Sequence, residues 1–178
     1  MSDEDEQARF TRLASLIGVT PAQLARHVVR PLDPPADRPP DGWVVPSACR
    51  DLFSITDGLN LFSAEPPHAF RLWGTHDYDA CVQYGGPIFE QARQDGLFPI
   101  YGDIPHLSSI LILDGSVVAT DWEVYGVARH GWRLAIAPDL YEYLRTLMLV
   151  REAYGYEEDY PSDWWAPYAS YGKRYDQE

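Results

Sequence analysis

Residues Val45 to Phe62 read V-P-S-A-C-R-D-L-F-S-I-T-D-G-L-N-L-F, which combines a helix start, a helix body and a helix stop. Pro46 suits the first turn of a helix, because the N–H that proline lacks has no partner inside the helix there. The residues that share one helical face, at spacings i, i+3, i+4 and i+7, are Cys49, Leu52, Phe53 and Thr56. Gly58 follows Asp57 and can adopt the left-handed conformation that ends a helix. The stretch therefore predicts a short amphipathic helix that begins at Pro46 and closes at Asp57.

Residues 1–30 are expected to form a helical hairpin. Apolar side chains keep helical spacing at Phe10, Leu13, Ala14 and Ile17, and Gly18 follows them as a stop. Thr20 and Gln23 have the spacing of a capping box, so a second helix is expected to run to about Val29. Six prolines then lie from Pro31 to Pro46 and predict a stiff, extended connector over residues 31–46 within a single domain of residues 1–178.

After residue 62 the pattern changes to short apolar runs with strand character. The expected strands are Phe70 to Trp73, Phe98 to Tyr101, Ser109 to Leu113, Val117 to Asp121, Glu123 to Ala128 and Trp132 to Ile136. Asp114-Gly115 separates two of them and favours a two-residue hairpin turn. Pro138-Asp139 begins a last helix, with Leu144 and Leu147 on its buried face. These elements predict an α+β fold with a single antiparallel sheet of about five to six strands and helices packed mainly on one face.

The order and spacing of these motifs resemble the SUKH superfamily, which includes bacterial toxin-immunity proteins and the fungal Smi/Knr cell-wall regulators. The resemblance covers residues 45–148 and includes F-R-L-W-G at residues 70–74 and F-P-I-Y-G-D at residues 98–103. The residues that match the family pattern are Pro46, Asp57, Gly58, Trp73, Gly74, Pro99, Gly102 and Asp103. Most of them are expected to be structural. Asp57-Gly58 stands where the family usually has Asn-Gly, and the connector and a long C-terminal tail exceed the minimal domain.

The resemblance implies a SUKH-like recognition scaffold without a catalytic set. On this interpretation the chain is an immunity protein of a bacterial polymorphic toxin system, and it neutralises a cognate toxin, such as a nuclease, by direct binding. The alternative that the family offers is a regulatory or scaffold protein of the Smi/Knr kind. A remote alternative is a hydrolase that uses Asp103, His106 or the His76-Asp77 cluster, although no catalytic motif supports it.

Composition indicates the kind of partner. The chain has 27 acidic and 14 basic residues and a formal net charge of −13, which repels nucleic acid and attracts basic proteins. Residues 13–25 resemble the start of a DNA-binding helix-turn-helix, but the negative charge favours a structural hairpin instead. No apolar run is long enough to cross a membrane, and the acidic N-terminus lacks the basic start of a signal peptide, so a cytoplasmic location is expected. The spacing of cysteines and histidines predicts neither a metal site nor a cofactor.

Two surfaces are candidates for the basic partner, and the sequence leaves the choice between them open. The first is the family groove near Trp73 and Asp103. The second combines acidic and aromatic residues in and near the tail, residues 154–178: Asp121, Trp122, Glu123, Glu157, Glu158, Asp159, Trp164 and Trp165. Aromatic anchors rimmed by carboxylates are typical of protein interfaces, but the same rings are also expected if the tail simply wraps the domain. The oligomeric state is not predicted.

Overall fold

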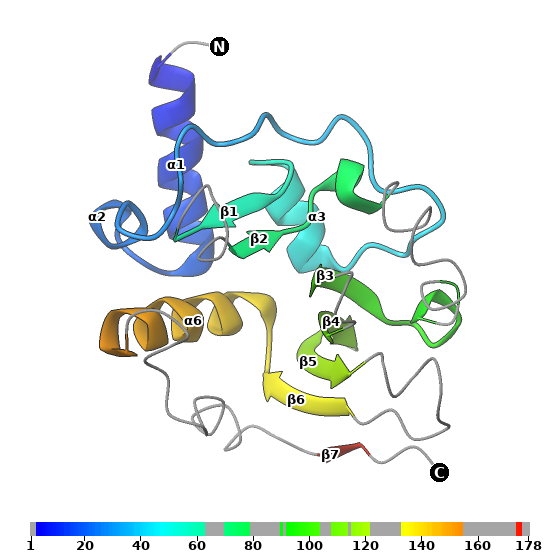
Figure 1. Ribbon diagram of the computed structural model, residues 1–178. Coiled ribbons are helices and arrows are strands. Elements are labelled where there is room, and N and C mark those ends of the chain that lie inside the picture. Colours follow the sequence, from blue (N-terminus) through cyan, green and yellow to red (C-terminus); the bar gives the residue numbers. More distant parts are fainter. Residues whose placement is uncertain are drawn as a thin grey trace.

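The computed structural model describes residues 3–62, 70–78, 90, 92–103, 108–113, 115–121, 133–154 and 174–175. Its helices are α1 (Asp3–Ile17), α2 (Pro21–Leu24), α3 (Ser47–Phe53) and α6 (Leu140–Tyr154) (Figure 1). Its strands are β1 (Leu59–Leu61), β2 (Phe70–Leu72), β3 (Phe98–Asp103), β4 (Ser108–Leu113), β5 (Ser116–Asp121), β6 (Arg133–Ala137) and β7 (Arg174–Tyr175). The mixed helix-and-strand class predicted from the sequence is confirmed.

The strands of the described residues form two antiparallel sheets. β1 pairs with β2, and a second sheet has the order β3-β4-β5-β6-β7. The expectation of a single sheet was therefore wrong. The physical reason is that β2 is only three residues long and uses its ladder on β1, while the next residue, Trp73, donates one backbone hydrogen bond of 2.9 Å to Ile100 of β3.

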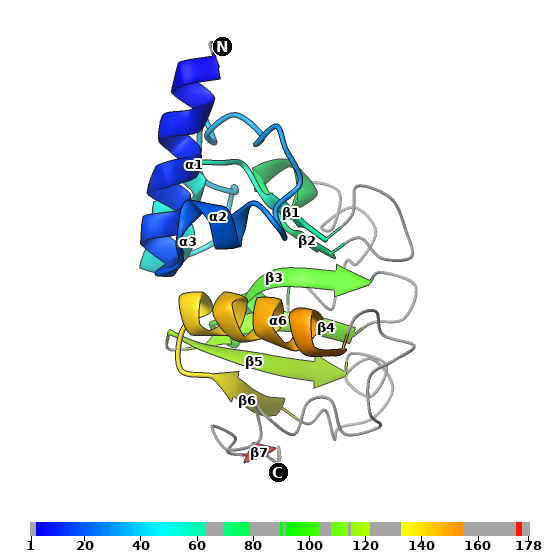
Figure 2. The same ribbon diagram turned by 90° about the vertical axis from the view of Figure 1, so that its left-hand side faces the viewer.

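The helices form layers beside the strands. Figure 2 shows α6 lying across the five-stranded sheet, whereas α1, α2 and α3 lie beside β1 and β2. α6 contacts β5 and β6 as well as α1 and α3. One hydrophobic core joins these layers, from Phe10 in α1 through Leu32 and Val45 of the connector to Met148 in α6. No helix within the described ranges is long and apolar enough to cross a membrane.

The second helix of the N-terminal hairpin is shorter than expected. The capping box is present, since the Gln23 N–H donates to the Thr20 hydroxyl and the Gln23 side chain accepts from the Thr20 N–H. However, α2 ends at Leu24 rather than near Val29. Residues 27–29 run beside β1 instead, where Val28 forms a β-bridge with Leu61. Tertiary pairing of the backbone has overridden local helix propensity here.

The helix of the opening stretch is also shorter than expected. Pro46 lies at its N-cap position, but α3 ends at Phe53 and not at Asp57. The chain leaves the helix because the Asp57 N–H donates to the carbonyl of Pro34 in the connector, 2.7 Å away. Gly58 does have the expected positive φ, +90°, and this conformation turns the chain into β1 instead of ending the helix.

The hairpin and the last helix follow the prediction. β4 and β5 are antiparallel neighbours, and the pairing of Leu113 with Ser116 leaves a two-residue loop in which Gly115 has a φ of +85°. α6 is capped by Asp139, whose carboxylate accepts from the Glu142 N–H at 2.8 Å. Leu144 and Leu147 are buried, as expected. The strand expected over Glu123 to Ala128 lies outside the described residues.

Candidate functional site

Five of the eight residues that carry the family resemblance meet at the junction of the two sheets: Asp57, Gly58, Trp73, Gly74 and Pro99. Gly58 and Gly74 are in close contact, since a Cβ on Gly58 would lie 2.9 Å from the Gly74 nitrogen. A Cβ on Gly74 would lie 2.6 Å from the carbonyl carbon of Asp57. Residues that are 16 positions apart in the chain are thus packed backbone to backbone, which only glycine permits.

Two carboxylates at the junction cap a helical turn at residues 75–78. Asp57 accepts from the backbone N–H of Thr75 and, at 2.7 Å, from the Thr75 hydroxyl. Asp77 accepts from the Gly74 N–H at 2.7 Å. These bonds satisfy N–H groups that a helix start leaves without internal partners. The His76-Asp77 cluster is therefore part of a helix start.

The same geometry does not assemble a nucleophile. The Thr75 hydroxyl donates to Asp57 rather than to an imidazole, and the Thr75 side chain is buried. His76 lies 3.9 Å from Asp57 through its Nε2 atom, and its side chain is 92% exposed. A hydroxyl activated for attack would need a base that accepts its proton and a third group that orients that base. Thr75, His76 and Asp57 are not arranged in this way.

Arg71 of β2 forms ion pairs with two acids at the junction, Asp33 and Asp77. Its guanidinium donates to Asp77 at 3.0 Å, to Asp33 of the connector at 3.1 Å and to the side-chain oxygen of Asn60 in β1 at 3.1 Å. Burial lowers the pKa of Arg71, but attraction by Asp77 and Asp33 outweighs it and leaves the pKa above its ordinary value. The Arg71 guanidinium therefore stays charged, and its hydrogen bonds tie the connector to the small sheet.

Trp73 is part of the core at the junction. It is 7% exposed, and its ring meets Tyr78 edge-on at 5.6 Å. A cavity of about 10 Å³ lies between Trp73, α3 and the start of α6. It is too small and too apolar to hold a ligand or a well-bonded water. Burial also raises the pKa of the Cys49 thiol beside it to about 12.

Asp103 and Asp121 lie at the C-terminal ends of β3 and β5, away from the junction residues Pro99 and Ile100. Ser108, the first residue of β4, pairs with Asp103 on one side and with Asp121 on the other. Asp103 and Asp121 therefore flank Ser108, one on each side, at one end of three adjacent strands. Gly102 pairs with Ser109 in the next row of the sheet. The junction and the Asp103–Asp121 row are consequently different places.

The other predicted partner-binding residues lie outside the described ranges. They are Trp122, Glu123, Glu157, Glu158, Asp159, Trp164 and Trp165. His106 also lies outside them. Near the end of the tail, β7 pairs Arg174 with Leu134 and Tyr175 with Arg133 of β6. That short segment of the tail therefore returns to the edge of the large sheet.

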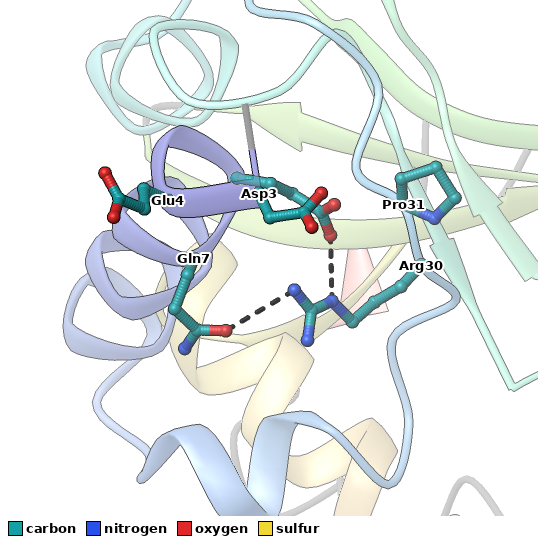
Figure 3. Close-up of a pocket in the computed structure, with 6 residues that line it drawn as sticks. Asp3, Glu4, Gln7, Arg30 and Pro31 are labelled. Carbon is teal, nitrogen blue, oxygen red and sulfur yellow. Dashed lines mark hydrogen bonds and ion pairs between the residues drawn. The ribbon is translucent and has the colours of Figure 1, made fainter. Parts of the chain in front are cut away.

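A surface depression that the sequence did not predict lies beside the N-terminal end of α1. It has a volume of about 740 Å³ and is lined by Asp3, Glu4, Glu6, Gln7, Arg30 and Pro31 (Figure 3). Arg30 donates to Glu6 at 2.8 Å and its guanidinium carbon lies 4.7 Å from the centre of the Phe10 ring. The run of acids at the start of the chain is the only signal that pointed to this place.

No protein-family model, curated protein or solved structure matches the chain. Within the part of the chain that the structure describes, no group of three or more His, Cys, Asp or Glu side chains could hold a metal ion.

Proposed function

We propose that the protein is a non-enzymatic binding protein that neutralises a cognate toxin by capping a basic surface of that toxin. A nuclease is the class of toxin that fits best, because a cleft built to hold a nucleic acid is positively charged. The single observation that carries the proposal is the net charge of −13. The same proposal includes a SUKH-like fold, which is supported by the resemblance of residues 45–148 to that superfamily.

The arrangement of carboxylates supports a surface away from the junction. Asp33 and Asp77 are paired with Arg71, and Asp57 is used by Thr75, so these acids hold the fold together. Asp103 and Asp121 stand at the end of the large sheet, and the acidic tail returns to the same sheet through β7. We propose the toxin-binding surface on this side and expect the acidic residues and the Trp164-Trp165 pair of the tail to contribute to it.

The first test asks whether a partner exists. The probe is the protein encoded next to this chain in its genome, produced as a catalytically inactive variant and passed over the immobilised chain in surface plasmon resonance. Binding that slows by an order of magnitude between low and physiological salt is the expected result for an association steered by charge. Absence of binding, with no protection of cells that express the neighbouring protein, would reject the immunity role and favour a regulatory scaffold.

The second test asks where the partner binds. Replacing Glu157, Glu158 and Asp159 together by their amides should mainly lower the association rate. The matched control replaces three exposed acids elsewhere, Asp3→Asn, Glu4→Gln and Asp37→Asn, which changes the net charge equally. If the control slows association as much as the tail variant, the tail is not the binding surface and only the overall charge matters.

A further inference from the structure

At a β-bulge in β3, two consecutive carbonyl groups accept hydrogen bonds from the segment that follows β2. Pro99 pairs with Leu111 and Tyr101 pairs with Ile110, so Ile100 is the extra residue of a bulge. The carbonyl of Ile100 accepts the backbone N–H of Trp73 at 2.9 Å. The carbonyl of Pro99 accepts the hydroxyl of Tyr78. Both bonds come from one segment, residues 73–78.

This segment is held firmly at both of its ends. At its start, the backbone contact between Gly74 and Asp57 attaches it to the turn that precedes β1. Asp57 and Asp77 cap the helical turn that follows, as described above. At its end, the Tyr78 ring is only 2% exposed and stacks at 5.1 Å from Phe98, the first residue of β3. The segment therefore links the small sheet to the large one through a short, capped and buried piece of chain.

We propose that residues 73–78 form a latch that couples the two sheets, so that releasing the Tyr78 hydroxyl from Pro99 lets the β1–β2 sheet open locally while the β3–β6 ladder stays formed. The reason is the difference in backbone bonding. Ladders of four to six residue pairs join β3, β4, β5 and β6, whereas one backbone bond, from Trp73 to Ile100, connects β3 with the residue that follows β2 within the described residues. Proteins open locally in contiguous cooperative units, which often coincide with a supersecondary motif such as the β1–β2 hairpin. The proposal does not depend on the identity of the partner.

The test is native-state hydrogen exchange on the full chain, comparing Tyr78→Phe with Tyr141→Phe. Both substitutions remove one hydroxyl that donates to a backbone carbonyl of another element, since Tyr141 of α6 donates to Ala48 of α3 at 3.2 Å. Tyr78→Phe leaves a buried carbonyl without its donor, so exchange at Trp73 and in β1–β2 should accelerate about tenfold, with β4 and β5 unchanged. Tyr141→Phe should not accelerate β1–β2 selectively.

Two results would overturn the latch. Equal acceleration in β1–β2 and in β4–β5 would mean that Tyr78→Phe only lowers global stability. Unchanged exchange at Trp73 would mean that the Tyr78 hydroxyl does not hold the junction. If Tyr78→Phe does not fold, Thr75→Val provides the second variant, because it removes only the hydroxyl that donates to Asp57. It should accelerate β1–β2 in the same selective way but by less.

Discussion

Replacing Gly74 by Ala tests the close backbone packing at the junction. The added Cβ would lie 2.6 Å from the carbonyl carbon of Asp57 and 2.7 Å from its Oδ1 atom, where ordinary contacts of a Cβ begin at 3.4 Å. The atoms it meets include backbone, which cannot rotate away as a flexible side chain would. Forcing extra atoms into a packed site typically costs about 1–3 kcal/mol, and we expect Gly74→Ala to reach the upper end, about 3 kcal/mol.

Gly96→Ala is the matched control. Gly96 has a φ of +73°, and an added Cβ there would find nothing within 4 Å. Its replacement therefore carries only the conformational penalty of the left-handed region, about 1–2 kcal/mol, which is offset in part by the lower entropy of the unfolded chain. In a chain of this length about 1 kcal/mol shifts the melting temperature by about 2–4 °C. We expect losses of about 6–12 °C for Gly74→Ala and about 2–4 °C for Gly96→Ala.

The assay is thermal unfolding followed by far-ultraviolet circular dichroism, with urea unfolding of the same variants to give the free energy. A Gly74→Ala variant that melts no lower than Gly96→Ala would refute the reasoning. It would mean that the Asp57 turn and the start of the 73–78 segment are not packed as closely as the structure has them.

Three further predictions concern the core and the ends of helices. Trp73→Ala should lower the free energy of unfolding in urea by about 3–5 kcal/mol, and an unchanged midpoint would contradict its burial. Cys49 should resist alkylation at pH 8 in a Cys81→Ser background until the chain is unfolded. Because burial raises the pKa of Cys49 from 9.0 to about 12, the stability that its protonated thiol contributes should be lost as the pH rises from 9.0 to about 12, and Cys49→Ala should lack that loss. Arg145 donates to the Ile17 carbonyl at the end of α1, a helix with no basic residue in its last turn, so Arg145→Met should cost about 1–2 kcal/mol by the same urea assay.

Local signals in the sequence predicted the elements whose structure depends on near neighbours. The two-residue loop before Ser116 needs only a hairpin turn between two apolar runs, and the start of α6 needs only the carboxylate of Asp139. Gly18, which has a φ of +82°, ends α1 for the same local reason. In each case the residues that specify the conformation lie within a few positions of it.

The errors arose where distant residues compete for the backbone. Helix propensity favoured α2 as far as Val29, but pairing of residues 27–29 with β1 removed its last turn. Gly58 was predicted to end α3, but the helix ends at Phe53. The Asp57 N–H donates to the carbonyl of Pro34 and not to a carbonyl within the helix. β1 has three residues, too few for a periodic pattern, and was not predicted at all. The convergence of Asp57, Gly74 and Pro99 likewise requires contacts that no sequence window contains.

The structure divides the acidic residues by what they bind, and this division bears on how the function can be tested. At the junction the carboxylates of Asp33, Asp57 and Asp77 are occupied by Arg71, by Thr75 and by backbone N–H groups, so their loss should lower stability before it affects any partner. Asp3 and Glu4 are exposed and form no ion pair among the described residues, so amides there should leave stability nearly unchanged. Variants that weaken binding without lowering the melting temperature therefore exist only outside the junction. If the proposed immunity role holds, a loss of protection in cells caused by Asp57→Asn would reflect loss of the fold. The same loss caused by amides in the tail, at an unchanged melting temperature, would locate the surface that meets the proposed toxin.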